Sequence, residues 1–342
     1  MAIAESSGSD AVIVRVLNLL VLPLRVPPQL EQSLARTADA LARAERLGDP
    51  VQLCWALGRR ASIKAWAGDI DETDRCLEQA GLLADQVGQP GMRWVVSNEL
   101  VARAILAGDV ERAERLAAEA FDIGTNAGEP DVGLYFNGQV LGICARRGTL
   151  SDIAELIAQT ARENPGLPAL IGNLARAYVQ GGNLDDARRL LDEFAQSGFD
   201  PPLDFLWLIG MVGWAEVAIA CRDPEYAGPI FDRLAPWADQ LTYIDLATEG
   251  PVSLYLGGLC AVLGRYDEAE AYFAKSADFC GRAAAKCFAA QTDLWWGAML
   301  AERDAPGDAR RAGELLSRAH ASAVAHGYGS IERDAAEALR RR

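Results

Sequence analysis

Lysine and histidine are scarce in this chain of 342 residues. The sequence has three lysines, 30 arginines and two histidines, His320 and His326. A serine or cysteine nucleophile needs a histidine within hydrogen-bond reach, and both histidines lie near the end of the sequence. They are six positions apart, which puts their side chains on opposite sides of a helix, where they are poor joint metal ligands. The sequence therefore predicts no catalytic residues and no metal site.

Motifs for phosphate and diphosphate chemistry are also missing. There is no GxxxxGK[ST] loop to hold nucleotide phosphates and no DDxxD motif. Acidic pairs such as Asp185–Asp186 and Glu268–Glu270 come just after turns, where carboxylates favour the positive end of a helix dipole. We interpret them as structural, and we expect no cofactor and no enzymatic activity.

The seven cysteines form no CxxC pair. If the nearest two, Cys280 and Cys287, lay on one helix, about 10 Å of rise would separate them, which is too far for a disulfide. An odd, scattered set is typical of small buried side chains in a reducing compartment. The sequence therefore predicts a cytoplasmic protein.

Only one long apolar run is present, Val12–Leu24, and it contains Arg15 and Pro23. A membrane helix needs about 20 apolar residues, so no membrane association is expected. The run is either a helix or strand that caps the first repeat, or the remnant of a preceding domain. We accordingly divide the chain into a cap or linker segment, 1–27, and a repeat domain, 28–342.

Basic side chains are outnumbered, with 33 Lys and Arg against 48 Asp and Glu, a net charge of −15. This excess repels phosphate backbones and anionic lipid heads, so direct nucleic-acid binding is not expected. With nucleic acid and membrane surfaces disfavoured, we expect the partner to be a protein or a peptide.

What the sequence does contain is a repeat. Gly-x-Pro recurs every 40 residues at Gly48–Pro50, Gly88–Pro90 and Gly128–Pro130. A second mark, beginning as AGDIDET around Gly68, lies between these and recurs in steps of 40, 40, 34, 40, 42 and 43. Its later copies lie around Gly108, Gly148, Gly182, Arg222, Gly264 and Gly307.

Two such marks per period predict two antiparallel helices per unit, since glycine ends a helix and the following Asx or proline begins the next. A single helix pair cannot bury its apolar stripe, whereas stacked pairs can. We therefore expect an all-α, right-handed superhelical solenoid of about seven units of about 40 residues.

The small residues inside the helices resemble those of the tetratricopeptide (TPR) family. Leu256–Gly257 with Gly264, Tyr266, Ala269 and Phe273 matches that pattern closely, and Leu174–Ala175 with Tyr178, Gly182, Ala187 and Leu191 nearly as well. The resemblance covers about residues 28–342. It implies a noncatalytic module that binds a protein or peptide.

Units of 40 rather than 34 residues resemble the carboxy-terminal repeat region of bacterial ATPase-linked regulators, namely LuxR-type transcription activators and adenylate or guanylate cyclases. This resemblance implies a regulatory or scaffolding role in signalling or transcription control, with an ATPase, cyclase or transcription-regulator domain as partner. The alternatives are an effector-sensing fragment of a split regulator of this kind and an unrecognised helical enzyme.

In such solenoids the first helix of each unit lines the concave side. Arg146 and Arg176 are expected there, where they either clamp a carboxylate or phosphate group or form ion pairs with acidic neighbours in the chain. Trp207 and Trp214 are expected in the core. The full set of expected concave-face residues is Trp66, Asn98, Tyr135, Arg146, Arg176, Gln180 and Glu216.

Overall fold

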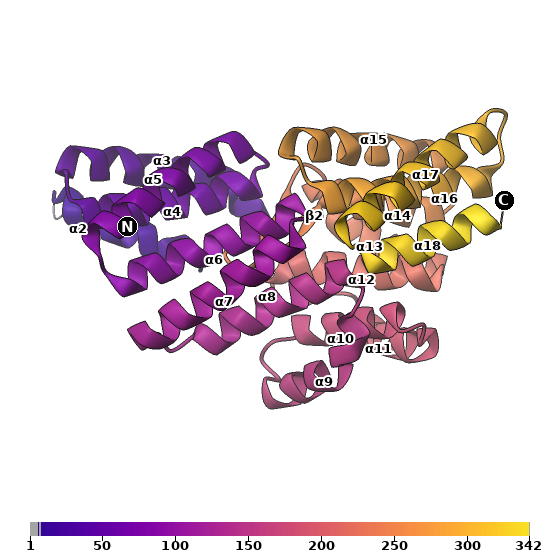
Figure 1. The fold of residues 1–342 in the computed structure, drawn as a ribbon, viewed down its shortest axis with the longest axis horizontal. Helices are drawn as coiled ribbons and strands as arrows, with labels where there is room; N and C mark the ends of the chain where they lie inside the picture. The colour runs from indigo at the N-terminus through magenta and orange to yellow at the C-terminus, as the bar shows by residue number, and fades with distance from the viewer. Residues whose placement is uncertain (1–5, 7, 342) are drawn as a thin grey trace.

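The fold is almost entirely α-helical, as Figure 1 shows, in a computed structural model that describes residue 6 and residues 8–341. The expected all-α solenoid of antiparallel helix pairs is confirmed. The α-helices are α2 (Asp10–Leu20), α3 (Leu30–Leu47), α4 (Pro50–Trp66), α5 (Ile70–Val87), α6 (Pro90–Ala107), α7 (Val110–Ala127), α8 (Val132–Arg147), α9 (Ala154–Glu163), α10 (Ala169–Gln180), α11 (Leu184–Gln196), α12 (Trp207–Cys221), α13 (Pro224–Leu234), α14 (Val252–Val262), α15 (Tyr266–Ala283), α16 (Lys286–Arg303), α17 (Asp308–His326) and α18 (Gly329–Arg340). Short 3-10 helices are η1 (Pro27–Gln29), η2 (Leu150–Ile153) and η3 (Ala235–Trp237).

The units begin with α4, and each consists of an even-numbered helix followed by an odd-numbered one, up to the pair α16 and α17. Helices α2 and α3 precede these units, and α18 follows them. In the third unit, α9 packs mainly against α10 of the next unit rather than against α8. Helix α9 therefore lies apart from α8, the first helix of its own unit.

The repeat marks have the local role that their residues predict. Gly48, Gly88 and Gly128 end their helices with φ of 65°, 70° and 70°, the left-handed conformation that glycine adopts without strain. Asp49 caps α4 and Asp109 caps α7, because their side chains accept hydrogen bonds from backbone N–H groups of the first turn. The periodicity in the sequence is therefore a periodicity of helix ends.

Helix α2 lies over the first helices of the solenoid. Ile13 and Leu17 pack against Ala40 of α3, and Val14 packs against Ala44 of α3 and Ala56 of α4. Within the segment 1–27, residues 1–5 and 7 lie outside the described part of the chain, as does Arg342 at the other end.

A β-hairpin interrupts the helical series between α13 and α14. Strand β1 (Leu241–Ile244) pairs antiparallel with β2 (Ala247–Pro251), and all residues of both strands are buried. The pairing shifts between Thr242 and Tyr243, which leaves Glu249 as a bulge residue. An isolated two-stranded hairpin is barely stable in water, so this one depends on the helices around it. They are α4, α6, α8, α12 and α14, the first helices of five units.

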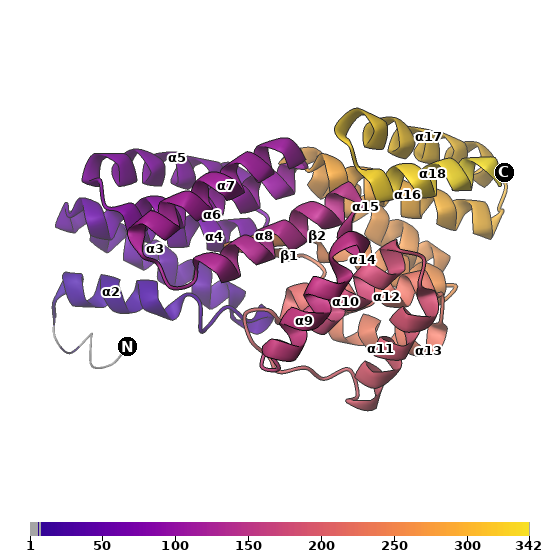
Figure 2. The same ribbon diagram turned by 60° about the horizontal axis from the view of Figure 1, so that its bottom comes forward.

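The last helices of the solenoid reach back to its second and third units. Helix α16 contacts α6, and α18 contacts α8 (Figures 1 and 2). The Tyr328 hydroxyl donates a hydrogen bond of 2.8 Å to the carbonyl of Gly108. One buried cluster joins Val101 and Ile143 to Leu294 and Ile331. The concave side is therefore enclosed, with the hairpin inside it.

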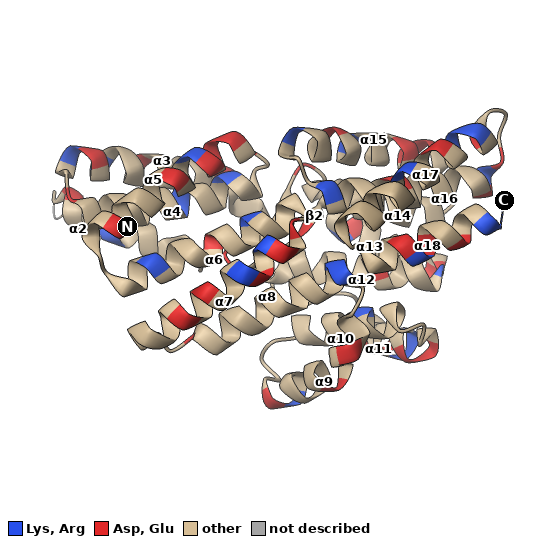
Figure 3. Cartoon of the chain, viewed as in Figure 1, with Lys and Arg blue, Asp and Glu red and all other residues tan. Residues whose placement is uncertain are grey.

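Charged side chains of both signs are interspersed along most helices (Figure 3). Within the described residues, no helix is both long and apolar enough to cross a membrane.

All seven cysteines are free thiols. Burial raises the pKa of Cys54 to about 11 and that of Cys287 to about 12.

Candidate binding groove

The concave side forms a groove whose centre is filled by the chain's own hairpin. Two acidic residues of the hairpin, Asp245 in its turn and Glu249 in its bulge, each form ion pairs with two arginines. We call the contacts of Asp245 the tip anchor and the contacts of Glu249 the bulge anchor.

The bulge anchor joins Glu249 to Arg146 of α8 and Arg176 of α10. Both guanidinium groups donate to Glu249 Oε2, each at 2.9 Å. Arg146 also donates to the carbonyl of Thr248, and Arg176 donates to Glu216 at 2.8 Å. Because Arg146, Arg176 and Glu249 are only about 4–5% exposed, these charges depend on one another for stabilisation.

The tip anchor holds the turn of the hairpin. Arg25, in the segment after α2, donates to Asp245 Oδ1 at 2.7 Å, and Arg59 of α4 donates to Oδ2 at 2.8 Å. The Ser62 hydroxyl adds a third hydrogen bond, at 2.6 Å. The anchor thus ties the beginning of the chain to a turn more than 200 residues later.

The two anchors lower the pKa of their carboxyl groups. Burial alone would raise the pKa of Asp245, but the positive charges of Arg25 and Arg59 outweigh it and hold this pKa below its usual range. Arg146 and Arg176 do the same for the pKa of Glu249. Both carboxylates therefore stay ionised at lower pH than ordinary Asp and Glu carboxyl groups do, and their contribution to stability is lost only as the pH falls through these lowered pKa values.

The pKa of Glu99, on α6, is shifted in the opposite direction. Its pKa is raised well above the ordinary value, first by burial and then by the negative charge of Asp245. It accepts a hydrogen bond of 3.2 Å from the Tyr243 hydroxyl. In the folded protein this carboxyl stays protonated at pH values where the unfolded chain has lost the proton. The free energy of unfolding therefore falls as the pH rises from the unfolded to the folded pKa.

We expect Glu99→Gln to remove this loss, because an amide keeps the hydrogen bond from Tyr243 and carries no charge. The variant should be more stable than the wild type at pH 8, with no gain at pH 4. Urea unfolding at both pH values measures the difference. Asp245→Asn is the control, since it should lose stability at pH 8, and equal stability of Glu99→Gln and wild type at pH 8 would contradict the assignment.

Four of the expected concave-face residues come together in the structure. Arg146, Arg176, Gln180 and Glu216 line one cavity of about 40 Å³ beside Glu249. That volume is enough for a water molecule or two. Gln180 donates to the carbonyl of Ala145 and accepts from the N–H of Leu150. The two arginines are paired within the chain, with Glu216 and Glu249.

The other three lie elsewhere in the groove. Trp66 donates to Gln240, just before β1, at 3.0 Å. Asn98 is buried and accepts a hydrogen bond of 2.7 Å from Gln139 of the next unit. Tyr135 is partly buried, with its ring centre 4.9 Å from that of Trp94. Each of the three therefore contacts other parts of the chain.

Sequence reasoning missed the residues that complete the two anchors. Arg25, Arg59, Asp245 and Glu249 were not among the expected concave-face residues. Arg25 precedes the repeats, and Asp245 and Glu249 belong to a hairpin that the helical period does not predict. The available signal for the hairpin was the short run of β-branched and aromatic residues in LTYI, followed by Asp245 and, five residues later, by Gly250 and Pro251.

One part of the groove remains open, beside the hairpin turn. This tip cleft has a volume of about 360 Å³ and lies where α9 has separated from α8. Leu246 at the hairpin turn closes one side and packs against Gly138 of α8, where a Cβ atom would come within 2.4 Å of its side chain. The main apolar residues of the walls are Leu134, Leu141, Leu156, Ile157, Leu170, Ile209 and Ile244.

The histidines are not part of the groove. Both lie on α17, and His326 Nδ1 is 2.9 Å from the carbonyl of Ser322. Among the described residues, no group of three or more His, Cys, Asp or Glu side chains is placed to hold a metal ion.

Comparison with known proteins supports the repeat assignment. A family model described as Tetratricopeptide repeat matches residues 146–202, from the end of α8 to the loop after α11. This range includes the unit at Leu174–Leu191 that carried the resemblance in the sequence. No curated protein matches the chain. The chain is thus TPR-like, and TPR repeats commonly mediate interactions between proteins.

Proposed function

We propose that the chain is a noncatalytic protein-interaction module with a regulatory or scaffolding role, and that it binds a partner segment at the tip cleft. The observation that carries this proposal is the cleft itself, an open apolar surface in an otherwise filled groove. Leu134 and Leu156 line it and are 56% and 57% exposed. Neighbouring exposed leucines at a concave surface are a feature of binding sites.

The hairpin adds a reason for a regulatory role. Ile244 and Leu246 form one wall of the cleft, and Asp245 between them is held by the tip anchor. A partner side chain in the cleft therefore contacts the hairpin directly and favours the hairpin position that it fits best. We infer that partner binding and hairpin position are coupled.

The resemblance to ATPase-linked regulators suggests which partners to expect. An ATPase, cyclase or transcription-regulator domain of LuxR type on another chain is our proposed partner, in the cytoplasm of a bacterium. The alternative is that the chain is the effector-sensing part of a split regulator, a role that the tip cleft also suits.

Position-specific photocrosslinking in the native cells tests the proposal. A benzophenone amino acid at Leu134, on the cleft wall, should crosslink a partner protein, which mass spectrometry then identifies. The matched control is Leu82 of α5, which is 69% exposed and lies outside the cleft. Crosslinking at 134 but not at 82 supports the proposal. Crosslinking at both positions, or only at 82, contradicts it.

A further inference from the structure

The repeat itself shows what covers the face of α8 that lines the tip cleft. Positions 54, 94 and 134 are equivalent in the 40-residue period, and each lies on the first helix of its unit. Cys54 of α4 and Trp94 of α6 are only 4% and 7% exposed, whereas Leu134 of α8 is 56% exposed. The same surface of a first helix is therefore buried in two units and open in the third.

The second helix of the unit covers this surface in the first two units. The Cys54 thiol donates to the carbonyl of Ala80 of α5, at 3.4 Å. Gly124 of α7 lies against Trp94, since a Cβ atom at Gly124 would come within 2.5 Å of the indole Nε1. Beside Leu134 this place is open, because α9 packs mainly on α10. The element that α8 lacks is a helix.

Larger side chains in the third unit account for the separation of α8 and α9. Ala113 and Ala117 of α7 correspond in the period to Ile153 and Ile157, which line the tip cleft. Small residues let two helix axes approach closely, whereas branched side chains overlap at the same spacing. The two walls of the cleft are therefore apolar faces that do not fit against each other as closely as those of α6 and α7.

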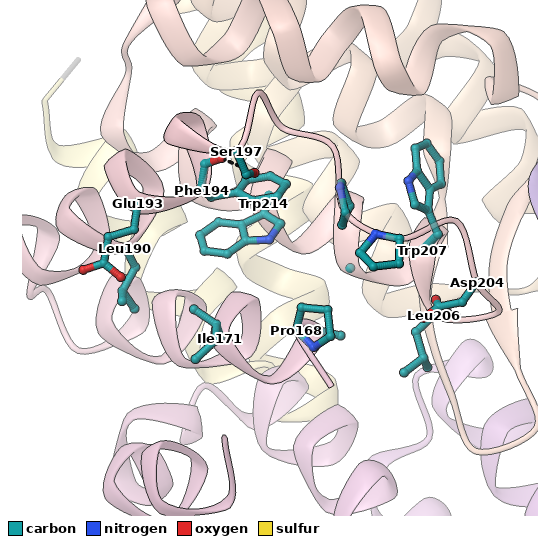
Figure 4. A pocket seen from close by; sticks show the side chains of 14 residues that line it. Pro168, Ile171, Leu190, Glu193, Phe194, Ser197, Asp204, Leu206, Trp207 and Trp214 are labelled. Atoms are coloured by element: carbon teal, nitrogen blue, oxygen red, sulfur yellow. Dashed lines mark hydrogen bonds between the residues drawn. The ribbon is translucent and has the colours of Figure 1, made fainter. Parts of the chain in front are cut away.

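Packing behind α10 fixes this arrangement. Helix α10 packs on α12, where Gly172 lies against the ring of Trp214, since a Cβ atom at Gly172 would be 3.4 Å from the indole Nε1. Phe194 of α11 stacks on the same ring with ring centres 4.6 Å apart, and Figure 4 shows this stack beside Ile171 of α10. Closing the cleft would disrupt either the contacts of α9 with α10 or those of α10 with this stack.

Charge indicates which kind of helix fits. Among the described residues that line the tip cleft, none is Lys, Arg or His, and the single charged one, Glu249, belongs to the bulge anchor. The exposed acidic residues next to the lining residues of α8 and α9 in the chain are Asp131, Asp152, Glu155 and Glu163. The basic residue among them, Arg162, pairs with Glu155 at 3.2 Å. This negative charge favours a partner with lysines or arginines beside its apolar stripe.

We propose that the tip cleft binds an amphipathic, basic helix of a partner protein, which lies along α8 in the place that α5 takes on α4 and α7 takes on α6. The proposal rests on the proposed function and adds the conformation and the charge of the bound segment.

Four peptides of 18 residues, the length of α5 and α7, test the proposal on the full-length protein by fluorescence anisotropy. Three have one composition of leucine, alanine and lysine. Their leucines recur at i, i+3, i+4 and i+7 in the helical peptide, at alternate positions in the strand peptide, and without period in the scrambled peptide. The fourth is the helical peptide with glutamate in place of lysine. We expect the helical lysine peptide to bind about tenfold or more tightly than each of the others.

Variants of the protein test the location. Leu134→Asp and Leu156→Asp each place a charge on one wall of the cleft and should weaken binding of the helical lysine peptide by about tenfold or more. The matched control is Leu82→Asp on α5, at a side chain that is 69% exposed and outside the cleft. All three changes make the protein more acidic, so non-specific attraction of a basic peptide would strengthen binding rather than weaken it.

Equal affinities for the helical, strand and scrambled lysine peptides, or no binding of any of them, would overturn the helical conformation of the bound segment. Equal affinities for the lysine and glutamate forms would overturn its charge. A loss in Leu82→Asp as large as that in Leu134→Asp would overturn the location. Failure of the proposed function is distinguishable, because a partner protein crosslinked at position 134 but not at 82 supports that function whichever peptide binds best.

Discussion

Replacing Glu249 by alanine is expected to lower the free energy of unfolding by about 3–5 kcal/mol, because the change leaves Arg146 and Arg176 buried without their shared carboxylate. Arg176 keeps Glu216, but Arg146 has no other ion-pair partner among the described residues. Its solvation cost is then uncompensated. Urea unfolding measures the loss, and hydrogen exchange of residues 241–251 shows whether the hairpin leaves the groove.

Two further variants separate burial from charge. Glu314→Ala removes an exposed partner of Arg310 at 2.7 Å and should cost less than about 1 kcal/mol. The triple change Arg146→Met, Arg176→Met and Glu249→Met replaces the bulge anchor by apolar side chains and should recover most of the stability lost in Glu249→Ala. If Glu249→Ala costs no more than Glu314→Ala and the hairpin amides stay protected, the bulge anchor does not hold the hairpin.

Gly329→Val is expected to open the contact between α18 and α8. A Cβ atom at Gly329 would lie 2.4 Å from the carbonyl oxygen of Arg147, and one at Gly148 would lie 2.4 Å from the N–H nitrogen of Ser330. Backbone atoms of two helices touch here, so no side-chain rotation can make room. We expect a loss of about 3 kcal/mol and a larger radius of gyration by small-angle scattering.

The matched control is Gly281→Val, near the end of α15. No atom lies within 4 Å of a Cβ atom there, so the stability should change by less than about 1 kcal/mol and the radius of gyration not at all. An unchanged radius of gyration for Gly329→Val, together with a stability loss no larger than that of Gly281→Val, would mean that the contact with α8 does not close the solenoid.

The helices could be predicted from the sequence because their ends carry local signals. Gly88 can take the left-handed conformation at the end of α5, and Asp109 can cap the start of α7, whatever the rest of the chain does. The hairpin could not be found in this way. Helices α13 and α14, of 11 residues each, are shorter than most of their counterparts, so the step between repeat marks stays at 42. The insertion therefore leaves the period nearly unchanged.

The arginines of the groove were partly predictable, and their partners were not. Helical phase places Arg146 and Arg176 on the concave side. The carboxylate between them lies 103 and 73 residues further along the chain, in an element of another type. The tryptophans Trp207 and Trp214 are in the core, as their apolar surroundings predict.

The enclosed groove also affects the order in which the chain can fold. A linear solenoid propagates from one unit to its neighbour, so its folding needs only local contacts. Here the pairs Arg25–Asp245 and Tyr328–Gly108 each span 220 residues, which makes the final steps slow, non-local loop closures. At ordinary rates of translation, Arg25 and Arg59 leave the ribosome on the order of ten seconds or more before Asp245. In every newly synthesised molecule, Arg25 and Arg59 therefore lack their ion-pair partner until Asp245 has been translated.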